Sequence, residues 1–259
     1  MKYSKKSLGQ NFLIDSNIIK KIVNLTEISN KNILEIGPGK GALTDKILQN
    51  NPKSLLLVEK DNILCDNLRE KYAGNKKILI INKDILKFNI KDNIKKNTII
   101  FGNLPYNISS QILVKIIRLP LSTSYTGLIL MFQKEMAERI LGKYGSSKYG
   151  RLSILANYKL KIIDRFNVSP NCFFPKPKID STVLFLTPKN NKQKILKLEN
   201  LEKVTNILFS NKRKMINKNI KKILDNLKIK KIKNLDLEAR PSELKPEKYY
   251  EITQLYEER

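Results

Sequence analysis

The sequence ILEIGPGKG at residues 33–41 decides the fold of this chain. Its first four residues are a short, mostly apolar run, which is typical of a buried strand. The three glycines that follow allow backbone torsions and a close ligand approach that other residues do not allow. Residues 42–49 then have the pattern of a helix. A strand, a glycine-rich turn and a helix together form the opening unit of a nucleotide-binding α/β domain.

Strands and helices continue to alternate after this unit. The runs that predict them are, in chain order, 54–58, 62–72, 78–81, 98–102, 110–118 and 127–132. This alternation predicts an α/β fold with a doubly wound, Rossmann-like parallel sheet. Two later apolar stretches, at 152–160 and 182–186, are expected to complete a large domain over residues 1–187.

A second, smaller domain is predicted over residues 188–259. It begins with a polar linker at 188–192, and the pattern beyond the linker is helical throughout. Apolar residues at helical spacing are expected to form one buried stripe, with lysines interleaved on the solvent side. The members of the stripe are Ile216, Ile220, Ile223, Leu224 and Leu227.

The composition excludes several kinds of site. The chain contains no histidine, which rules out Ser-His-Asp triads and every zinc motif that needs a histidine. The two cysteines, Cys65 and Cys172, are too few for a four-cysteine zinc site or a disulfide framework. No apolar run approaches the length of about 18 residues that a membrane span needs, and the start lacks the apolar core of a signal peptide. We therefore expect a cytoplasmic protein without a metal.

The charge of the chain favours a polyanionic partner. There are 50 basic residues against 24 acidic ones, a net charge of +26. Lysines outnumber arginines 42 to 8, however, which is also typical of a protein from an AT-rich genome. The distribution is more informative, because residues 212–233 hold ten basic residues and a single acid, Asp225. This uneven placement favours a nucleic acid.

Polar residues and glycines follow each of the first strands. Since ligands of open parallel sheets bind beyond the carboxyl ends of the strands, these residues are expected to meet at one pocket. They are Glu35, Gly37, Gly39, Glu59, Asp84 and Asn103. An acid after the second strand suits ribose hydroxyls, and one after the third suits an adenine amine. The pattern predicts an adenosine-bearing cofactor. Nicotinamide is the rival cofactor, but its Gly-x-Gly-x-x-Gly fingerprint is absent.

The sequence Asn103-Leu104-Pro105-Tyr106 follows the fourth of these strands. The Asn103 oxygen and a main-chain carbonyl held by Pro105 could accept both hydrogens of an exocyclic amine. The Tyr106 ring could stack on the heterocycle that carries this amine. These residues predict a site for the amino group of a nucleobase; the alternative is an ordinary proline turn after a strand.

Six segments of the chain resemble the KsgA (RsmA) family of small-subunit rRNA adenine N6,N6-dimethyltransferases. The segments are 6–13, 34–44, 103–107, 148–153, 173–181 and 209–214. Since they extend over nearly the whole chain, the resemblance implies a class I methyltransferase fold and S-adenosylmethionine as the cofactor.

The resemblance also implies roles for individual residues. Those expected to bind the cofactor are Asn11, Leu13, Gly37, Gly39, Glu59, Asp84 and Asn103. Those expected at the catalytic site are Asn103, Leu104, Pro105, Tyr106 and Phe173, with Tyr106 and Phe173 on the two faces of the flipped base. Phe173 could instead be a core aromatic. Those expected to contact RNA are Arg213, Lys214, Lys218, Lys221 and Lys222, together with Lys2, Lys5 and Lys6.

The expected substrate is therefore two adjacent adenosines in a hairpin near the 3′ end of small-subunit rRNA, and the expected enzyme is a monomer. Three alternatives stay open. The first is a large-subunit rRNA adenine methyltransferase that confers antibiotic resistance, and the second is a non-catalytic ribosome-assembly or transcription factor on the same fold. The third is a DNA adenine methyltransferase, although no separate DNA-reading module is apparent.

Overall fold

The computed structural model describes residues 10–120 and 125–258. The chain forms two compact units, one of residues up to Ala137 with Ile162–Pro188, the other of Glu138–Lys161 with Lys189 onward. Part of the predicted opening motif, residues 6–9, and the predicted RNA contacts Lys2, Lys5 and Lys6 lie outside the described residues.

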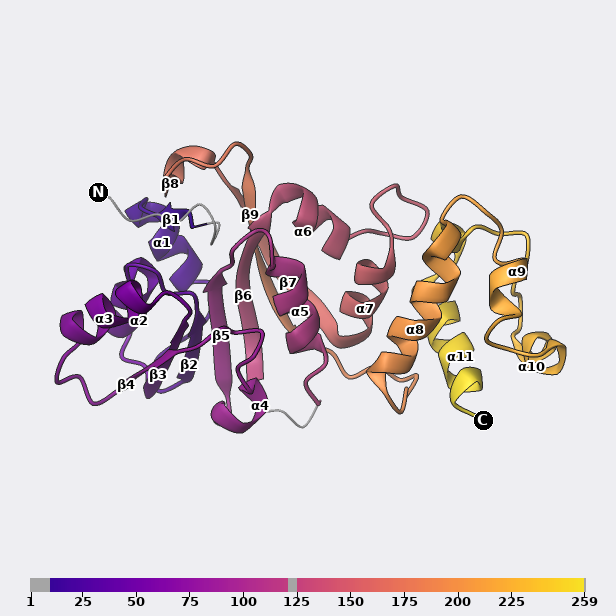
Figure 1. The fold of residues 1–259 in the computed structure, drawn as a ribbon, viewed down its shortest axis with the longest axis horizontal. Coiled ribbons are helices and arrows are strands. Elements are labelled where there is room, and N and C mark those ends of the chain that lie inside the picture. Colours follow the sequence, from indigo (N-terminus) through magenta and orange to yellow (C-terminus); the bar gives the residue numbers. More distant parts are fainter. Residues whose placement is uncertain (1–9, 121–124, 259) are drawn as a thin grey trace. The chain divides into compact units, whose positions relative to one another are not determined.

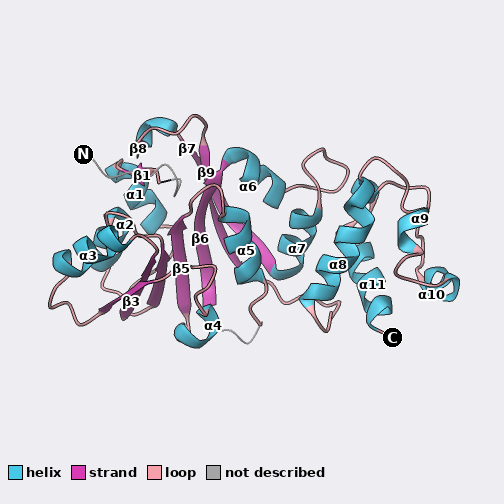
Figure 2. Ribbon diagram, viewed as in Figure 1, coloured by secondary structure: helices cyan, strands magenta, loops and turns pink. Residues whose placement is uncertain are grey.

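The first unit is built on a seven-stranded sheet with the order β4-β3-β2-β5-β6-β9-β7 (Figures 1 and 2). Its strands are β2 (Asn32–Ile36), β3 (Ser54–Glu59), β4 (Ile78–Asn82), β5 (Thr98–Asn103), β6 (Tyr125–Gln133), β7 (Leu160–Val168) and β9 (Ser181–Pro188). Its helices are α1 (Ser16–Val23), α2 (Ala42–Gln49), α3 (Asn62–Lys71), α4 (Ile90–Asn93) and α5 (Ser109–Ile117). The strands from β2 to β6 pair in parallel, and β9 pairs antiparallel with β6. The predicted doubly wound sheet is confirmed.

The central strands are apolar because both of their faces are covered. Every residue of β5 except the last is buried, and so is every residue of β2 except the first. Strand β2 pairs with both β3 and β5, so the strand order reverses there. The register aligns Ile36 of β2 with Val58 and Gly102, which brings the carboxyl ends of the three strands to one level. This edge is where an open α/β sheet binds its ligand.

A second, two-stranded sheet lies outside the main one. Strand β1 (Phe12–Leu13) pairs antiparallel with β8 (Phe173–Phe174), with Phe12 opposite Phe174 and Leu13 opposite Phe173. Leu13 and Phe173 are buried in the core, whereas Phe12 is half-buried and Phe174 is 42% exposed. This follows from strand geometry, since successive side chains point to opposite faces.

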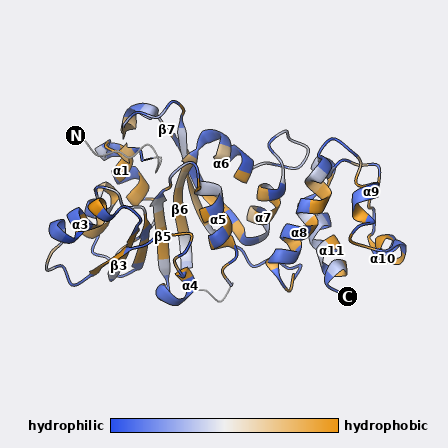
Figure 3. Cartoon of the chain, in the orientation of Figure 1, coloured by the Kyte–Doolittle hydropathy of each residue, from blue (hydrophilic) through white to orange (hydrophobic). Residues whose placement is uncertain are grey.

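The second unit is helical. The helices of this part of the chain are α6 (Lys134–Ile140), which begins in the first unit, α7 (Arg151–Lys159), α8 (Leu198–Leu208), α9 (Asn217–Ile220), α10 (Asn226–Lys231) and α11 (Pro246–Glu257). Figure 3 shows hydrophobic and hydrophilic residues alternating along α8, as expected of an amphipathic helix.

The stretch 152–160 was expected in the large domain, but most of it is α7, which packs in the second unit. Tyrosines account for this difference. The Tyr250 hydroxyl donates to the Ile154 carbonyl at 3.3 Å, and the rings of Tyr158 and Tyr250 lie 5.0 Å apart. The Tyr149 hydroxyl, just before α7, donates to the Leu244 carbonyl at 3.0 Å. These contacts join 138–161 to the C-terminal helices.

The predicted apolar stripe is continuous only as far as Leu224. Its first four members are buried, but Leu227 is 75% exposed. The cause is a break in the helix, because α9 ends at Ile220 and the carboxylate of Asp225 accepts the Lys228 N–H at 2.8 Å as the N-cap of α10. The new helix starts with a different rotation, so the predicted spacing no longer holds.

Candidate active site

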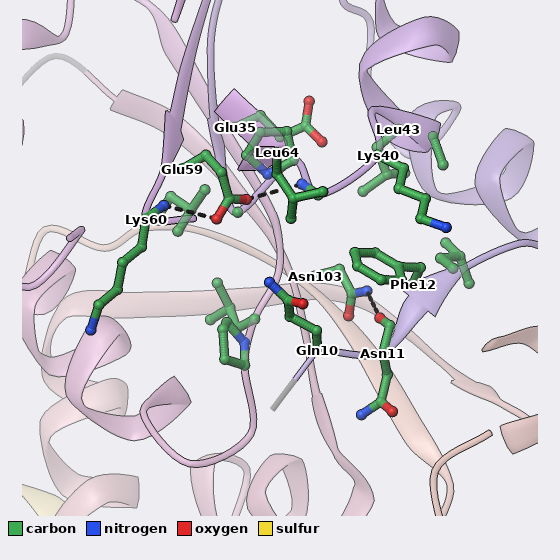
Figure 4. Close-up of a pocket in the computed structure, with 18 of the residues that line it drawn as sticks. Gln10, Asn11, Phe12, Glu35, Lys40, Leu43, Glu59, Lys60, Leu64 and Asn103 are labelled. Carbon is green, nitrogen blue, oxygen red and sulfur yellow. Dashed lines mark hydrogen bonds between the residues drawn. The ribbon is translucent and has the colours of Figure 1, made fainter. Parts of the chain in front are cut away.

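A cavity of about 480 Å³ opens at the carboxyl edge of the sheet, within the size range of small-molecule sites. Most of the predicted cofactor and catalytic residues line it. They are Asn11, Leu13, Gly37, Gly39, Glu59, Asp84, Asn103, Leu104, Pro105 and Tyr106. Residues of the N-terminal segment complete the wall beside them (Figure 4).

Glu59 ends β3 and is held by main-chain donors. Its Oε1 accepts the N–H groups of Lys60 at 2.8 Å and Asp61 at 2.9 Å, and its Oε2 accepts that of Gly39 at 3.1 Å. Figure 4 shows Glu59 beside Lys60. Burial raises the pKa of Glu59, while these hydrogen bonds oppose the rise. A carboxylate has about four acceptor sites and three are occupied here, so Oε2 of Glu59 keeps capacity for one ribose hydroxyl.

Glu35 lines the same cavity but is 1% exposed. Its Oε2 accepts the Thr44 hydroxyl at 2.7 Å. Burial is the main cause that raises its pKa to about 8, and the Thr44 hydrogen bond acts against it. The sequence prediction placed Glu35 at this edge without giving it a ligand. Its raised pKa follows from burial, which the sequence alone does not show.

The glycine turn between β2 and α2 is shaped by left-handed backbone. Gly37 and Gly39 have φ values of 65° and 60°. A Cβ built on Gly39 would lie 3.0 Å from Cδ1 of Phe12, whereas one built on Gly37 would meet nothing within 4 Å. Glycine at 39 therefore avoids both torsional strain and a tight contact with Phe12.

Asp84 lies after β4 and is paired with Lys60, whose ammonium is 2.9 Å from Oδ2. Its Oδ1 accepts the Leu86 N–H at 2.9 Å. Burial would raise the pKa of Asp84, but the hydrogen bonds from Lys60 and Leu86 and the nearby lysine charges outweigh it and lower that pKa. An ionised acceptor therefore stands at the edge where an adenine amine is expected.

Asn103 ends β5, and its amide orientation is set by the N-terminal segment. Its Nδ2 donates to the Asn11 carbonyl at 2.9 Å (Figure 4). Because the nitrogen faces Asn11, the Oδ1 atom is turned the other way, as an acceptor for a target amine must be. Tyr106 is fixed as well, since its hydroxyl lies 2.7 Å from the Ser181 Oγ.

Phe173 is the predicted site residue that does not line the cavity. It is 3% exposed and packs in the core, whereas its neighbour Phe174 lines the cavity. The pairing with β1 fixes which of the two rings faces the core. The alternation of strand side chains could have suggested this, but a two-residue strand leaves no pattern in the sequence.

The predicted RNA contacts belong to the second unit and are exposed. They are Arg213, Lys214, Lys218, Lys221 and Lys222. Within the part of the chain that the structure describes, no cluster of three or more acidic or cysteine side chains could hold a metal ion. No helix among the described residues is long and apolar enough to cross a bilayer.

Comparison with known proteins gives a consistent result. The sequence model of the family "Ribosomal RNA adenine dimethylase" matches residues 1–258. The "Ribosomal RNA small subunit methyltransferase A" of Pelagibacter ubique is 46% identical over 98% of this chain and 97% of its own. The protein of the same name from Malacoplasma penetrans is 41% identical, over 96% of this chain and 91% of its own.

Solved structures agree. A dimethyladenosine transferase from Plasmodium falciparum superimposes with a TM-score of 0.77 at 26% identity, covering 93% of this chain and 95% of its own. The 23S rRNA methyltransferase ErmE, at 23% identity and a TM-score of 0.69 over 95% of this chain and 100% of its own, shares the fold. The predicted methyltransferase fold, S-adenosylmethionine as cofactor and rRNA adenine dimethyltransferase activity are thereby confirmed. The chain belongs to the ribosomal RNA adenine dimethylase family.

Proposed function

We propose that this chain acts in the cytoplasm, in ribosome biogenesis, on two adjacent adenosines in a hairpin near the 3′ end of small-subunit rRNA. Each adenosine receives two methyl groups at N6. The names of the relatives support the small subunit as substrate. The observation that carries the chemistry is the Asn103 amide, held with its nitrogen on Asn11 and its oxygen available beside the cofactor pocket.

The cofactor would be held by residues at successive strand ends. The Gly37–Gly39 turn would approach its methionine portion, with the buried Glu35 close to that turn. Glu59 would accept a hydrogen bond from a ribose hydroxyl, and Asp84 would accept one from the adenine amine. Asn11 and Leu13 would close this pocket from the N-terminal side. When bound, S-adenosylmethionine supplies a methyl group made electrophilic by its sulfonium.

The protein's contribution is alignment. Asn103 Oδ1 and the Leu104 carbonyl, held by Pro105, would accept the two N–H groups of the target amine. This favours a pyramidal nitrogen whose lone pair faces the methyl group. Alignment of two reacting groups is worth up to about 7–11 kcal/mol in ideal cases. The methylated nitrogen is acidic and can lose its proton to water, so a chain without histidine can support the reaction.

The target base must leave its stack, which costs a few kcal/mol and less in a loop than in a duplex. Tyr106 would stack on one face, and stacking contributes about 1–3 kcal/mol per ring. Phe173 was expected on the other face. Because Phe173 is buried, Phe174 is the ring that reaches the pocket without rearrangement of the core.

The helical unit would bind the RNA phosphates around the hairpin through its exposed basic residues. The ten basic residues of 212–233 make it the strongest cationic segment of the chain. We further propose a monomer without a metal. The alignment chemistry needs no Lewis acid.

The direct test is to incubate the protein with isotopically labelled cofactor and unmodified ribosomal subunits of each size. Mass spectrometry of the digested RNA then identifies the product nucleoside and its position. We expect N6,N6-dimethyladenosine at two adjacent positions of small-subunit rRNA. Label in large-subunit rRNA would support a resistance methyltransferase instead, and absence of label in both would support a non-catalytic assembly factor.

A further inference from the structure

The N-terminal segment at residues 10–13 contacts both halves of the active site. On the cofactor side, the half-buried ring of Phe12 lies against the glycine turn, where a Cβ on Gly39 would come within 3.0 Å of it. The ammonium of Lys40 lies 5.0 Å from the centre of the same ring. On the amine side, the carbonyl of the preceding residue, Asn11, accepts the Asn103 amide at 2.9 Å.

These contacts form an unbroken path between the two ligand sites. Glu59, expected to hold the ribose, accepts the Gly39 N–H at 3.1 Å. The ring of Phe12 lies where a Cβ on Gly39 would come within 3.0 Å of it. The carbonyl of the adjacent residue, Asn11, accepts the Asn103 amide (Figure 4). The path therefore runs from the carboxylate at the end of β3 to the amide at the end of β5 through Phe12 of β1 and the residue before it, Asn11.

The segment has a defined position because β8 pairs with it. Phe12 lies opposite Phe174, and the Ile14 N–H donates to the Cys172 carbonyl at 2.9 Å. The Leu13 side chain is anchored in the core. On the other side of Asn11, the Gln10 Nε2 donates to the Asp61 Oδ2 at 3.2 Å. The ring of Phe12 against Gly39 is thus one of the contacts that set the position of the Asn11 carbonyl, and it is the one on the cofactor side.

We propose that Phe12 is a positioning residue for methyl transfer, an inference that rests on the proposed function. Its ring, seated on Gly39, holds the Asn11 carbonyl in place, and this carbonyl keeps the Asn103 oxygen toward the target amine. Without the ring, the Asn103 amide loses its fixed orientation and can present its nitrogen, which is a donor and cannot accept an amine hydrogen. In the wild type, Phe12 therefore couples the cofactor site to the orientation of the Asn103 amide.

The first test compares Phe12→Ala with Phe12→Tyr, which keeps the ring. The kcat and the KM for the cofactor are measured on unmodified small ribosomal subunits, and the affinity for S-adenosylhomocysteine is measured by calorimetry. We expect Phe12→Ala to lower kcat by about tenfold to a hundredfold at saturating cofactor, the range for a misplaced reacting group. Phe12→Tyr should stay close to wild type. A rise in the cofactor KM alone, with kcat unchanged, would overturn the proposal.

The glycine turn offers a matched pair of variants in case Phe12→Ala does not fold. Gly37→Ala and Gly39→Ala introduce the same left-handed strain, but only the second pushes on Phe12. Both should weaken S-adenosylhomocysteine binding. At saturating cofactor, Gly39→Ala should lower kcat further than Gly37→Ala, and equal values would contradict the role of Phe12. If wild-type protein methylates neither subunit, the proposed function itself fails, a result distinct from active wild type with an unaffected Phe12→Ala.

Discussion

Glu35→Gln should change how stability depends on pH. The carboxyl is 1% exposed, and burial raises its pKa from 4.5 to about 8. Between these values the folded protein keeps a proton that the unfolded chain has lost. The contribution of Glu35 to the free energy of unfolding is therefore at its maximum below about pH 4.5. It falls by about 1.4 kcal/mol per pH unit between about pH 4.5 and about pH 8. The total is on the order of 5 kcal/mol.

The variant removes this titration with little change in shape. A glutamine oxygen can still accept the Thr44 hydroxyl, which donates to Glu35 at 2.7 Å. Without cofactor, the melting temperature of the variant should rise relative to that of the wild type as the pH increases from about 5 to 8. For a unit of this size about 5 kcal/mol corresponds to a difference on the order of 10 °C. Circular dichroism melts of both proteins at several pH values measure it.

The same proton links stability to ligand binding. If Glu35 faces the ammonium of the cofactor, S-adenosylhomocysteine binding at pH 7 should release a proton, because a nearby cation favours the ionised carboxylate. Calorimetry in two buffers of different ionisation enthalpy measures this release. Parallel melting curves for wild type and Glu35→Gln, together with no proton release, would refute the reasoning.

Three further predictions concern other parts of the chain. Phe174→Leu should lower turnover by about tenfold through loss of one stacking contact, whereas Phe173→Leu should mainly lower the melting temperature by opening a core cavity; equal losses of turnover would show that Phe173 reaches the base. Replacing both Arg213 and Lys214 with glutamine should weaken RNA binding and reduce the slope of log affinity against log salt by up to about 2, and an unchanged slope places them away from phosphate. Lys60→Met should change the free energy of unfolding by less than about 1 kcal/mol, since the lysine of this ion pair is half exposed, and a larger loss in a urea titration contradicts this.

The sheet and its strand-end residues were predictable because each produces a local pattern in the amino-acid sequence. Strands β3 and β5 contain continuous apolar runs, and Glu59 and Asn103 are the last residues of these two strands. Chain topology then requires their carboxyl ends to meet at one edge. Residues far apart in the sequence could therefore be assigned to one pocket before any coordinates were known.

Features that depend on long-range contacts were not predictable in this way. The pairing of β1 with β8 joins two-residue strands from opposite ends of the first unit, too short for any periodicity. It decides that Phe174, and not Phe173, faces the cavity. The grouping of α7 with the C-terminal helices depends on tyrosine contacts. The exposure of Leu227 depends on the start of a new helix at Asp225. In each case tertiary contacts or a cap override the spacing.

The central claim is that the Asn103 oxygen holds the target amine in line with the methyl group. Asn103→Ala removes this acceptor at the end of β5 and leaves Glu59 and the glycine turn intact. Methyl transfer to small-subunit rRNA, followed with radiolabelled cofactor, should fall by about a hundredfold to a thousandfold, in the range for loss of a preorganised polar group. S-adenosylhomocysteine affinity should change little. Turnover close to wild type would contradict the account.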